Sequence, residues 1–351
     1  MKISNCPSKA TSLRFALAIL LSFVVHVAYA PNSKKKKDFN TKMYLGMCKG
    51  RQKLQGTHRD HATLKWLLQT SGELSVTSTD SHQNRAACWM LYDDKRKPKP
   101  ASKSMTQRYA LAVLFSATKG GTRWIDKTDW LSQKNECSWY GISCDAMSTI
   151  TDIDLGFNDL EGMLPRELGL LNPIEVDMHG NDLEGVVPYS VFRNWKSTRV
   201  LRLQMNGFFG AIPSEISHMT SLRELTIFGN YFGGKVPKEM AALKDLEHLD
   251  IYANTFTGSI PSELAQLKHL QDFDTHDNDF VGRVPSELCK RRMKSLISDC
   301  LGYRPEVICE CCTICCAGMP DMMCVDTETK EEVIVGQTAS IPKKNKATLA
   351  V

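Results

Sequence analysis

A chain of 351 residues with a formal net charge of +5 at pH 7 is long enough for one extended domain with a cap at each end. Its basic residues cluster at 34–37, at 95–103 and near the C-terminus, in stretches that resemble linkers and tails, so we do not expect nucleic-acid binding. The sequence contains no glycine-rich phosphate loop, no G-x-S-x-G and no H-E-x-x-H motif. We therefore predict no enzyme activity and no cofactor.

The N-terminus has the features of a secretory signal peptide, which we place at residues 1–30. Basic residues precede an uncharged run at 15–30, which ends in the small-x-small sequence Ala28-Tyr29-Ala30. Pro31 would hinder cleavage after this sequence, so an uncleaved N-terminal membrane anchor is the alternative. No second apolar run reaches the roughly 20 residues of a spanning helix, so we do not expect a C-terminal membrane helix followed by a kinase. We predict a protein that is secreted or held at the cell surface.

A basic, weakly patterned linker is expected at residues 31–60, where Cys48 has no obvious partner. Helices are expected between 61 and 118, with Asp80 or Ser81 as an N-cap. Because a solenoid exposes the apolar end of its first coil, these helices are the candidates for the cap that covers it.

Six copies of one pattern occupy residues 149–288. In each copy an Asn is followed by a Gly four residues later and a Pro seven residues later, and apolar residues usually stand five and three before it. The alternating apolar residues predict a short strand with one buried face, and stacked Asn side chains can bond neighbouring turns as a ladder. A fixed period of this length indicates a solenoid. The asparagines, at steps of 23, 25, 24, 24 and 24 residues, are Asn158, Asn181, Asn206, Asn230, Asn254 and Asn278.

The segment LEHLDIYANTFTGSIPSELAQL resembles the plant-type leucine-rich repeat, LxxLxLxxNxLxGxIPxxLxxL. Three small departures occur: Phe follows several of the asparagines, Thr275 replaces an apolar residue, and the third repeat is one residue longer near Trp195. The resemblance implies an α/β repeat fold, a right-handed solenoid of about six coils with short parallel strands on its concave side. The resemblance also implies a protein of the receptor-like ectodomain type that has no kinase domain.

An N-terminal cap is assigned to residues 61–148. It contains C-x-W-x-G-x-x-C, which resembles the cap of plant-type leucine-rich repeat proteins and implies a disulfide between Cys137 and Cys144. The segments WLLQTSG and QRYALAVLFSATKG ahead of it resemble the algal, diatom-type branch of the family.

A cysteine-rich C-terminal cap is assigned to residues 289–325, and a disordered polar tail to 326–351. The C-x-x-C spacing of Cys312 and Cys315 would suit zinc. Four disulfides are the favoured interpretation because the chain is expected to be exported, and eight cysteines allow 105 pairings. The eight are Cys289, Cys300, Cys309, Cys311, Cys312, Cys315, Cys316 and Cys324.

The expected function is recognition. Repeat proteins of this kind present an extended concave surface, and the resemblance to receptor-like ectodomains and to plant inhibitors of cell-wall hydrolases implies an extracellular protein, peptide or glycan as partner, with a membrane co-receptor as a further partner. The alternative is a structural cell-surface or wall component, or a hydrolase-inhibitor-like protein without a signalling role.

The binding face is predicted from strand alternation, which turns the residues six, four, two and one before each Asn away from the core. These positions include nine acidic side chains but a single Arg and no Lys. Phe228 and Tyr252 occupy one column of adjacent coils, and we expect them to centre a site for a cationic or mixed polar–aromatic ligand. The histidines on this face are expected to be exposed and structural, with no metal site. The candidate ligand-binding residues are Asp152, Asp154, Glu175, Asp177, His179, Arg202, Gln204, Glu224, Thr226, Phe228, His248, Asp250, Tyr252, Asp272, Asp274 and His276.

Overall fold

The computed structural model describes residues 47–50, 57–291, 293–301, 305–317 and 323–333, all within one unit that spans residues 41–351. The predicted signal segment, most of the predicted linker and the end of the predicted tail lie outside these residues. No helix in the described part of the chain is long and apolar enough to cross a membrane.

The N-terminal cap is helical, as expected. Ser81 and Ser102 act as N-caps: the hydroxyl of each accepts a hydrogen bond from the backbone N–H three residues later, and this fixes where the helix starts. The proline- and lysine-rich stretch before Ser102 interrupts the helices. The elements are α2 (His58–Ser71), α3 (Glu73–Thr77), α4 (His82–Cys88), the π-helical turn η2 (Trp89–Asp93) and α5 (Lys103–Ala117).

Part of the predicted linker belongs to this cap. Helix α2 begins at His58, so the last three residues of the predicted linker, 58–60, belong to this helix. Cys48, for which the sequence suggested no partner, is buried and forms a disulfide with Cys88 at the end of α4. The linker prediction is wrong at these positions, because a basic composition does not show where a buried cysteine ties the chain to a helix.

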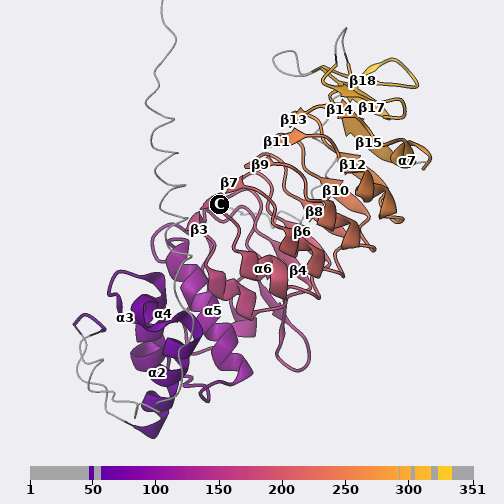
Figure 1. Ribbon diagram of the computed structural model, residues 1–351. Coiled ribbons are helices and arrows are strands. Elements are labelled where there is room, and N and C mark those ends of the chain that lie inside the picture. Colours follow the sequence, from indigo (N-terminus) through magenta and orange to yellow (C-terminus); the bar gives the residue numbers. More distant parts are fainter. Residues whose placement is uncertain (1–46, 51–56, 292, 302–304, 318–322, 334–351) are drawn as a thin grey trace, which may run out of the picture. The chain divides into compact units, whose positions relative to one another are not determined.

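The repeats form a solenoid, which confirms the predicted fold (Figure 1). One strand from each coil joins a long sheet in which successive coils pair in parallel, and antiparallel β1 (Ile142–Cys144) of the cap starts this sheet. The strands of the six coils are β2 (Ile150–Asp154), β4 (Glu175–Asp177), β6 (Val200–Arg202), β8 (Glu224–Thr226), β10 (His248–Asp250) and β12 (Asp272–Asp274).

A second sheet follows the asparagines. Its strands are β3 (Glu161–Met163), β5 (Asp182–Gly185), β7 (Gly207–Gly210), β9 (Tyr231–Gly234), β11 (Thr255–Gly258) and β13 (Asp279–Phe280). Short helices that start after the repeat prolines close the coils: η4 (Arg166–Leu170), α6 (Tyr189–Asn194), η5 (Ser214–His218), η6 (Lys238–Ala242), η7 (Ser262–Gln266) and α7 (Ser286–Cys289).

The extra residue of the third repeat has a structural reason. Helix α6 is α-helical where four of the other coils have a tighter 3-10 turn, and the longer turn accommodates the buried Trp195. The Trp195 indole donates a hydrogen bond to the carbonyl oxygen of Leu168 in the preceding coil.

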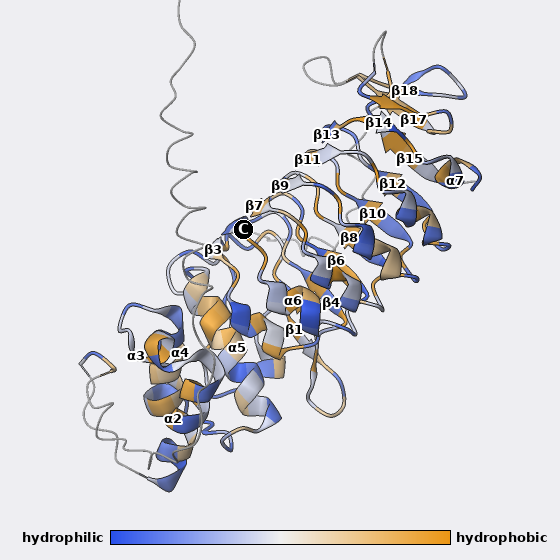
Figure 2. Cartoon of the chain, in the orientation of Figure 1, coloured by the Kyte–Doolittle hydropathy of each residue, from blue (hydrophilic) through white to orange (hydrophobic). Residues whose placement is uncertain are grey.

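The core lies between the two sheets and the short helices. Figure 2 shows hydrophobic and hydrophilic residues alternating along the coils, as expected for strands with one buried face. The Phe residues that replace Leu after the asparagines are buried and stack in a column, with ring centroids 6.1–6.5 Å apart. Thr275 is also buried, and its hydroxyl donates to the carbonyl oxygen of Ile297, so the polar residue is tolerated.

The predicted asparagine ladder is present. Asn230 donates to the carbonyl oxygens of Leu203, Ile227 and Phe228 at 3.0, 3.0 and 3.2 Å, and accepts a hydrogen bond from the backbone N–H of Phe208. Each Asn thus bonds its own turn and the preceding coil. The first rung, Asn158, makes the same kind of contact with the backbone of Asp126 in the cap, which joins the cap to the solenoid.

The solenoid continues beyond the six predicted coils. Strand β15 (Ser295–Ser298) pairs in parallel with β12, and β17 (Ile314–Cys316) pairs in parallel with β15. Antiparallel β18 (Cys324–Asp326) and β19 (Glu332–Val333) finish the long sheet, and β14 (Gly282–Arg283) pairs with β16 (Val307–Ile308). The described residues 326–333 are therefore ordered, and the predicted disordered tail began too early.

All twelve cysteines of the described residues form disulfides. Cys137 pairs with Cys144, as the resemblance implies. The C-terminal cap contains four bridges, Cys289–Cys311, Cys300–Cys315, Cys309–Cys312 and Cys316–Cys324, which tie together the coil ends that no further repeat covers.

Candidate functional site

The outward side of the long sheet, hereafter the long-sheet face, collects the predicted binding residues. The inward residues Leu225, Leu249 and Phe273 are buried, so their neighbours on the same strands point outward. The register places Glu224, His248 and Asp272 side by side, and Thr226, Asp250 and Asp274 side by side two residues further along. The earlier coils align in the same way, with Asp152 beside Glu175 and Asp177 beside Arg202.

Three of the predicted residues are less accessible than expected. Gln204, Thr226 and His276 have only 6, 8 and 4% of their surface exposed. All three stand in the columns that strand alternation turns outward, and the ring of Tyr252 covers that of His276. The prediction of an exposed His276 is therefore wrong.

Aromatic rings form a continuous stack on this face. The ring of Tyr252 lies 4.4 Å from that of Phe228, with 11° between the planes, and 4.6 Å from that of His276, with 13° between the planes. The spacing predicts the first pair, and the structure adds His276. Because both faces of the Tyr252 ring are covered, a ligand would meet the edges of the rings and the Tyr252 hydroxyl.

Opposite charges compensate one another at the N-terminal end of the long-sheet face. The guanidinium of Arg202 makes two hydrogen bonds to Glu224, at 2.6 and 2.8 Å, and lies 3.9 Å from Asp177. The carboxylate of Asp177 also contacts the imidazole of His179. These acids already have partners within the protein, which makes them poor candidates for holding a cationic ligand.

The acids at the other end are differently placed. Burial, followed by the neighbouring Asp274, raises the pKa of Asp250 to about 8. Oxygen Oδ1 of Asp250 is inaccessible and has no hydrogen-bond partner among the described residues. Burial also raises the pKa of Asp274, although the Nδ1 atom of His276 lies only 2.5 Å from its carboxylate. We call Asp250, Tyr252, Asp274 and His276 the acidic–aromatic cluster.

His276 carries positive charge more readily than an ordinary histidine. Burial lowers its pKa, but Asp274, Asp299 and Asp277 together outweigh that effect and raise it. Even with this imidazolium, the carboxylates of Asp250, Asp274 and Asp299 leave a surplus of negative charge in and around the acidic–aromatic cluster when they are ionised.

Asp299 is the functional candidate that the sequence analysis missed. It takes the ladder position of the next coil, where it accepts hydrogen bonds from the backbone N–H groups of Asp277 and Asn278. Burial raises its pKa to about 6. The repeat spacing points to this position, since Asp299 stands 21 residues after Asn278 and follows an apolar strand. It was missed because an Asp replaces the Asn of the other coils.

Side chains that can bind metals gather in two places among the described residues. His179 and His276 each pair with the Asp two residues before them, and His248 pairs with Asp272 of the next coil at 2.7 Å, so the three histidines do not converge on one ion. Within the described ranges, one group of three side chains has ligand atoms close enough for a metal.

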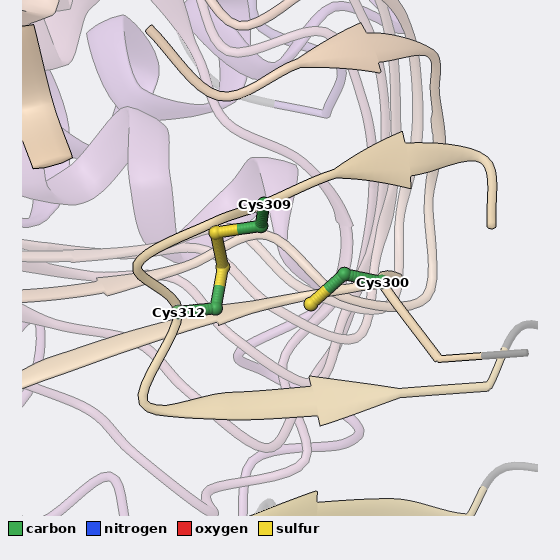
Figure 3. A group of neighbouring side chains, drawn as sticks. All are labelled: Cys300, Cys309 and Cys312. Atoms are coloured by element: carbon green, nitrogen blue, oxygen red, sulfur yellow. A yellow bond between two sulfur atoms is a disulfide. The ribbon is translucent and has the colours of Figure 1, made fainter. Parts of the chain in front are cut away.

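That group is Cys300, Cys309 and Cys312, whose sulfur atoms lie within 4.8 Å of one another. Figure 3 shows the bridge between Cys309 and Cys312, and Cys300 pairs with Cys315. Zinc binds thiolates, and each of these sulfurs is already in a disulfide. The structure therefore contains the four disulfides that the sequence analysis favoured over zinc.

Comparison with known proteins agrees with the repeats described above. The family model described as Leucine Rich Repeat matches residues 245–267, a segment that contains β10, β11 and the ladder residue Asn254. The chain therefore contains leucine-rich repeats. No protein among those with curated functions matches this leucine-rich repeat protein.

Solved structures with similar folds include a plant ice-binding protein, 22% identical, covering 55% of this chain and 62% of that one with a TM-score of 0.49. The ectodomain of the receptor kinase SOBIR1 from Arabidopsis thaliana is 25% identical. The match covers 51% of this chain and 95% of the SOBIR1 ectodomain, with a TM-score of 0.43. The ectodomain of the Arabidopsis receptor kinase HAESA, solved with a peptide hormone ligand, is 23% identical. The match covers 56% of this chain and 36% of the HAESA ectodomain, with a TM-score of 0.43.

The leucine-rich repeat protein spans less than two thirds of the ice-binding protein and about a third of the HAESA ectodomain. Since all three TM-scores lie below 0.5, the assignment of leucine-rich repeats rests on the repeats of the chain itself and on the family model that matches residues 245–267.

Proposed function

We propose that this leucine-rich repeat protein is an extracellular recognition module that binds a peptide, or an exposed segment of a protein, through the acidic–aromatic cluster. The observation that carries the proposal is the buried, unpartnered Oδ1 atom of Asp250 beside Asp274. Leaving a buried polar atom without a partner costs about 1–3 kcal/mol. Asp250 as a whole is only half-buried, so a cation bound to it from outside would offset part of that cost through its charge, without contacting Oδ1 itself.

The ligand group that fits is a cation with several N–H donors, such as a lysine or arginine side chain or an N-terminal ammonium. An ammonium near Asp250 would displace the proton that this carboxyl group holds at neutral pH, and the positive charge would then offset the repulsion between Asp250 and Asp274. The acidic surplus on the long-sheet face would also steer a cationic ligand towards it.

The aromatic stack favours a peptide over a glycan. Sugars pack on free ring faces, and both faces of the Tyr252 ring are occupied by Phe228 and His276. The exposed edges instead offer a narrow apolar strip that suits an aliphatic or aromatic side chain.

An extracellular location is part of the proposal. The twelve cysteines of the described residues all form disulfides, and such bonds persist in oxidising compartments. A membrane co-receptor remains a proposed further partner, and the absence of enzyme activity stays a prediction.

The proposal is tested by selecting peptides from a random library on the immobilised full-length chain, and by titrating the recovered peptides in a calorimeter. We expect recovered sequences to be enriched in Lys or Arg, and Asp250→Asn to weaken their binding about 10–100-fold. Glu175→Gln is the matched control, an acid removed from the same sheet but outside the acidic–aromatic cluster. Enrichment of acidic peptides, or equal effects of the two substitutions, would reject the proposal.

A further inference from the structure

The helical cap contains a cavity that the proposed binding face does not use. Its volume is about 370 Å³, which lies in the range of small-molecule sites. It lies between α4, α5, the start of η2 and the loop after α5. Its apolar lining comes from Ala86, Trp89, Ala112, Phe115 and Leu131. A closely packed helical cap has no structural need for an open space of this size.

The backbone around the cavity departs from regular structure at two of its lining residues. Trp89 begins a π-helical turn, a rare conformation that is frequent at functional sites. Leu131 adopts a φ of 56°, which is unfavourable for a bulky side chain. A hydrogen bond of 3.1 Å from the Trp89 indole to the Leu131 carbonyl oxygen links these two positions. Their joint effect is to hold two walls of the cavity in place.

The mouth of the cavity carries one uncompensated positive charge. Arg85 interacts with the Ser116 hydroxyl at 3.5 Å and with the Nδ1 atom of His82 at 3.4 Å. No carboxylate pairs with Arg85 among the described residues, whereas Lys119, the other cation of the lining, is paired with Glu161. A ligand with an anionic group could therefore pair with Arg85 while its apolar part fills the space beside Trp89.

We propose that this cavity binds a small organic anion with an apolar body, of the type of an aromatic carboxylic acid. The apolar walls would take the ring system, and the guanidinium of Arg85 would bind the carboxylate, with the Ser116 hydroxyl as a second donor. This site is separate from the long-sheet face in residues and in ligand chemistry, so it does not depend on the proposed function.

The test uses the full-length chain, 2-naphthoate as the anionic probe and 2-naphthalenemethanol as its neutral counterpart. Calorimetry should show one molecule of naphthoate bound per chain. Arg85→Gln should weaken naphthoate binding at least tenfold and leave the binding of the alcohol within about twofold. Lys65→Gln, an exposed cation of α2 outside the lining, is the control and should change neither affinity.

A second variant tests the location without relying on charge. Ala112→Leu places extra volume inside the cavity, so it should abolish the binding of both probes, with folding verified by near-ultraviolet circular dichroism. If Ala112→Leu does not fold, Ala86→Leu in the α4 part of the lining takes its place. The proposal is overturned if the native chain binds no naphthoate saturably, if Arg85→Gln and Lys65→Gln have equal effects, or if a folded cavity-filling variant binds both probes normally.

Discussion

Tyr252 stacks on Phe228 of the preceding coil, with the ring centroids 4.4 Å apart and the planes 11° from parallel. This contact covers one face of the tyrosine ring, and His276 covers the other. The stack is therefore a rigid apolar strip with its edges outward, beside the carboxyl group of Asp250. That arrangement is the basis for proposing a peptide ligand with a positive charge.

The first prediction concerns pH. Folding raises the pKa of Asp250 from 3.8 to about 8, so between these values the folded state holds a proton that the unfolded state has released. The free energy of unfolding should therefore contain a contribution that falls as pH rises from about 4 to 8. Asp250→Asn removes this contribution, and should raise stability at pH 8 by about 1–3 kcal/mol while having little effect at pH 4.

Urea unfolding at several pH values, followed by circular dichroism, measures this difference. Asp272→Asn is the control, because Asp272 is paired with His248 on the same face. A stability gain for Asp250→Asn that is the same at pH 4 and pH 8 would show that Asp250 is ionised throughout, against this account.

The second prediction concerns the asparagine ladder. Asn230→Ala leaves the Phe208 N–H and the carbonyl oxygens of Leu203 and Ile227 without their side-chain partner in a buried region. We expect a loss of about 2–4 kcal/mol in urea unfolding. Asn172→Ala, at an exposed position where Ser197 is the one partner of the side chain among the described residues, should cost less than about 1 kcal/mol. Similar losses for both variants would mean that the ladder adds no stability of its own.

The third prediction concerns a buried cation in the cap. Arg108 is fully buried between the rings of Trp89 and Trp139, 5.0 and 4.9 Å from their centroids, and pairs with Asp94 and Glu136 at 2.7 and 3.4 Å. Arg108→Met leaves two buried carboxylates without their counter-ion, so we expect a cost of about 3–5 kcal/mol.

Arg123→Met is the matched control for Arg108→Met. The ion pair of Arg123 with Asp159 is largely exposed, and removing it should cost much less than removing the buried pairs of Arg108. Thermal unfolding of both variants provides the comparison. A cost below about 1 kcal/mol for Arg108→Met would contradict the assignment of Arg108 as the charge that balances the two buried acids.

The fourth prediction ranks two disulfides of the cap. The bridge Cys48–Cys88 spans 40 residues and Cys137–Cys144 spans 7, so loop-closure entropy predicts stabilisation of about 4 and 2.5 kcal/mol. Replacing both cysteines of a pair by Ser should therefore lower stability more for Cys48–Cys88. Peptide mapping without reduction verifies the pairings first. Free thiols at these positions, or the reverse order of losses, would count against the pairing.

The sequence predicts the repeats well, because period and residue type together determine where each coil begins. Asn230 takes its predicted place in the ladder, and Phe228 and Tyr252 meet because they stand at equal distances before successive asparagines. Because successive coils pair in the same register, residues at equivalent positions of adjacent repeats lie side by side in the structure. The cap helices between 58 and 117 follow from ordinary capping and periodicity.

Other features depend on distances that the sequence does not contain. His276 was expected to be exposed, and it is buried because the Tyr252 ring happens to cover it. The partner of Cys48 depends on how an irregular segment meets α4, and the four bridges of the C-terminal cap depend on how β15 and β17 extend the sheet. The raised pKa of Asp250 likewise results from burial, which strand alternation does not predict.

The most direct test of the central claim is the affinity of the chain for one selected lysine- or arginine-containing peptide, measured by calorimetry at pH 7 and pH 9 for the native protein and for Tyr252→Ala with Asp250→Asn. Deprotonation of Asp250 should make the native chain bind more tightly at pH 9, by about tenfold. The double variant should bind at least 100-fold more weakly and lose the dependence on pH. An unchanged affinity in the double variant would place the ligand elsewhere and contradict the account.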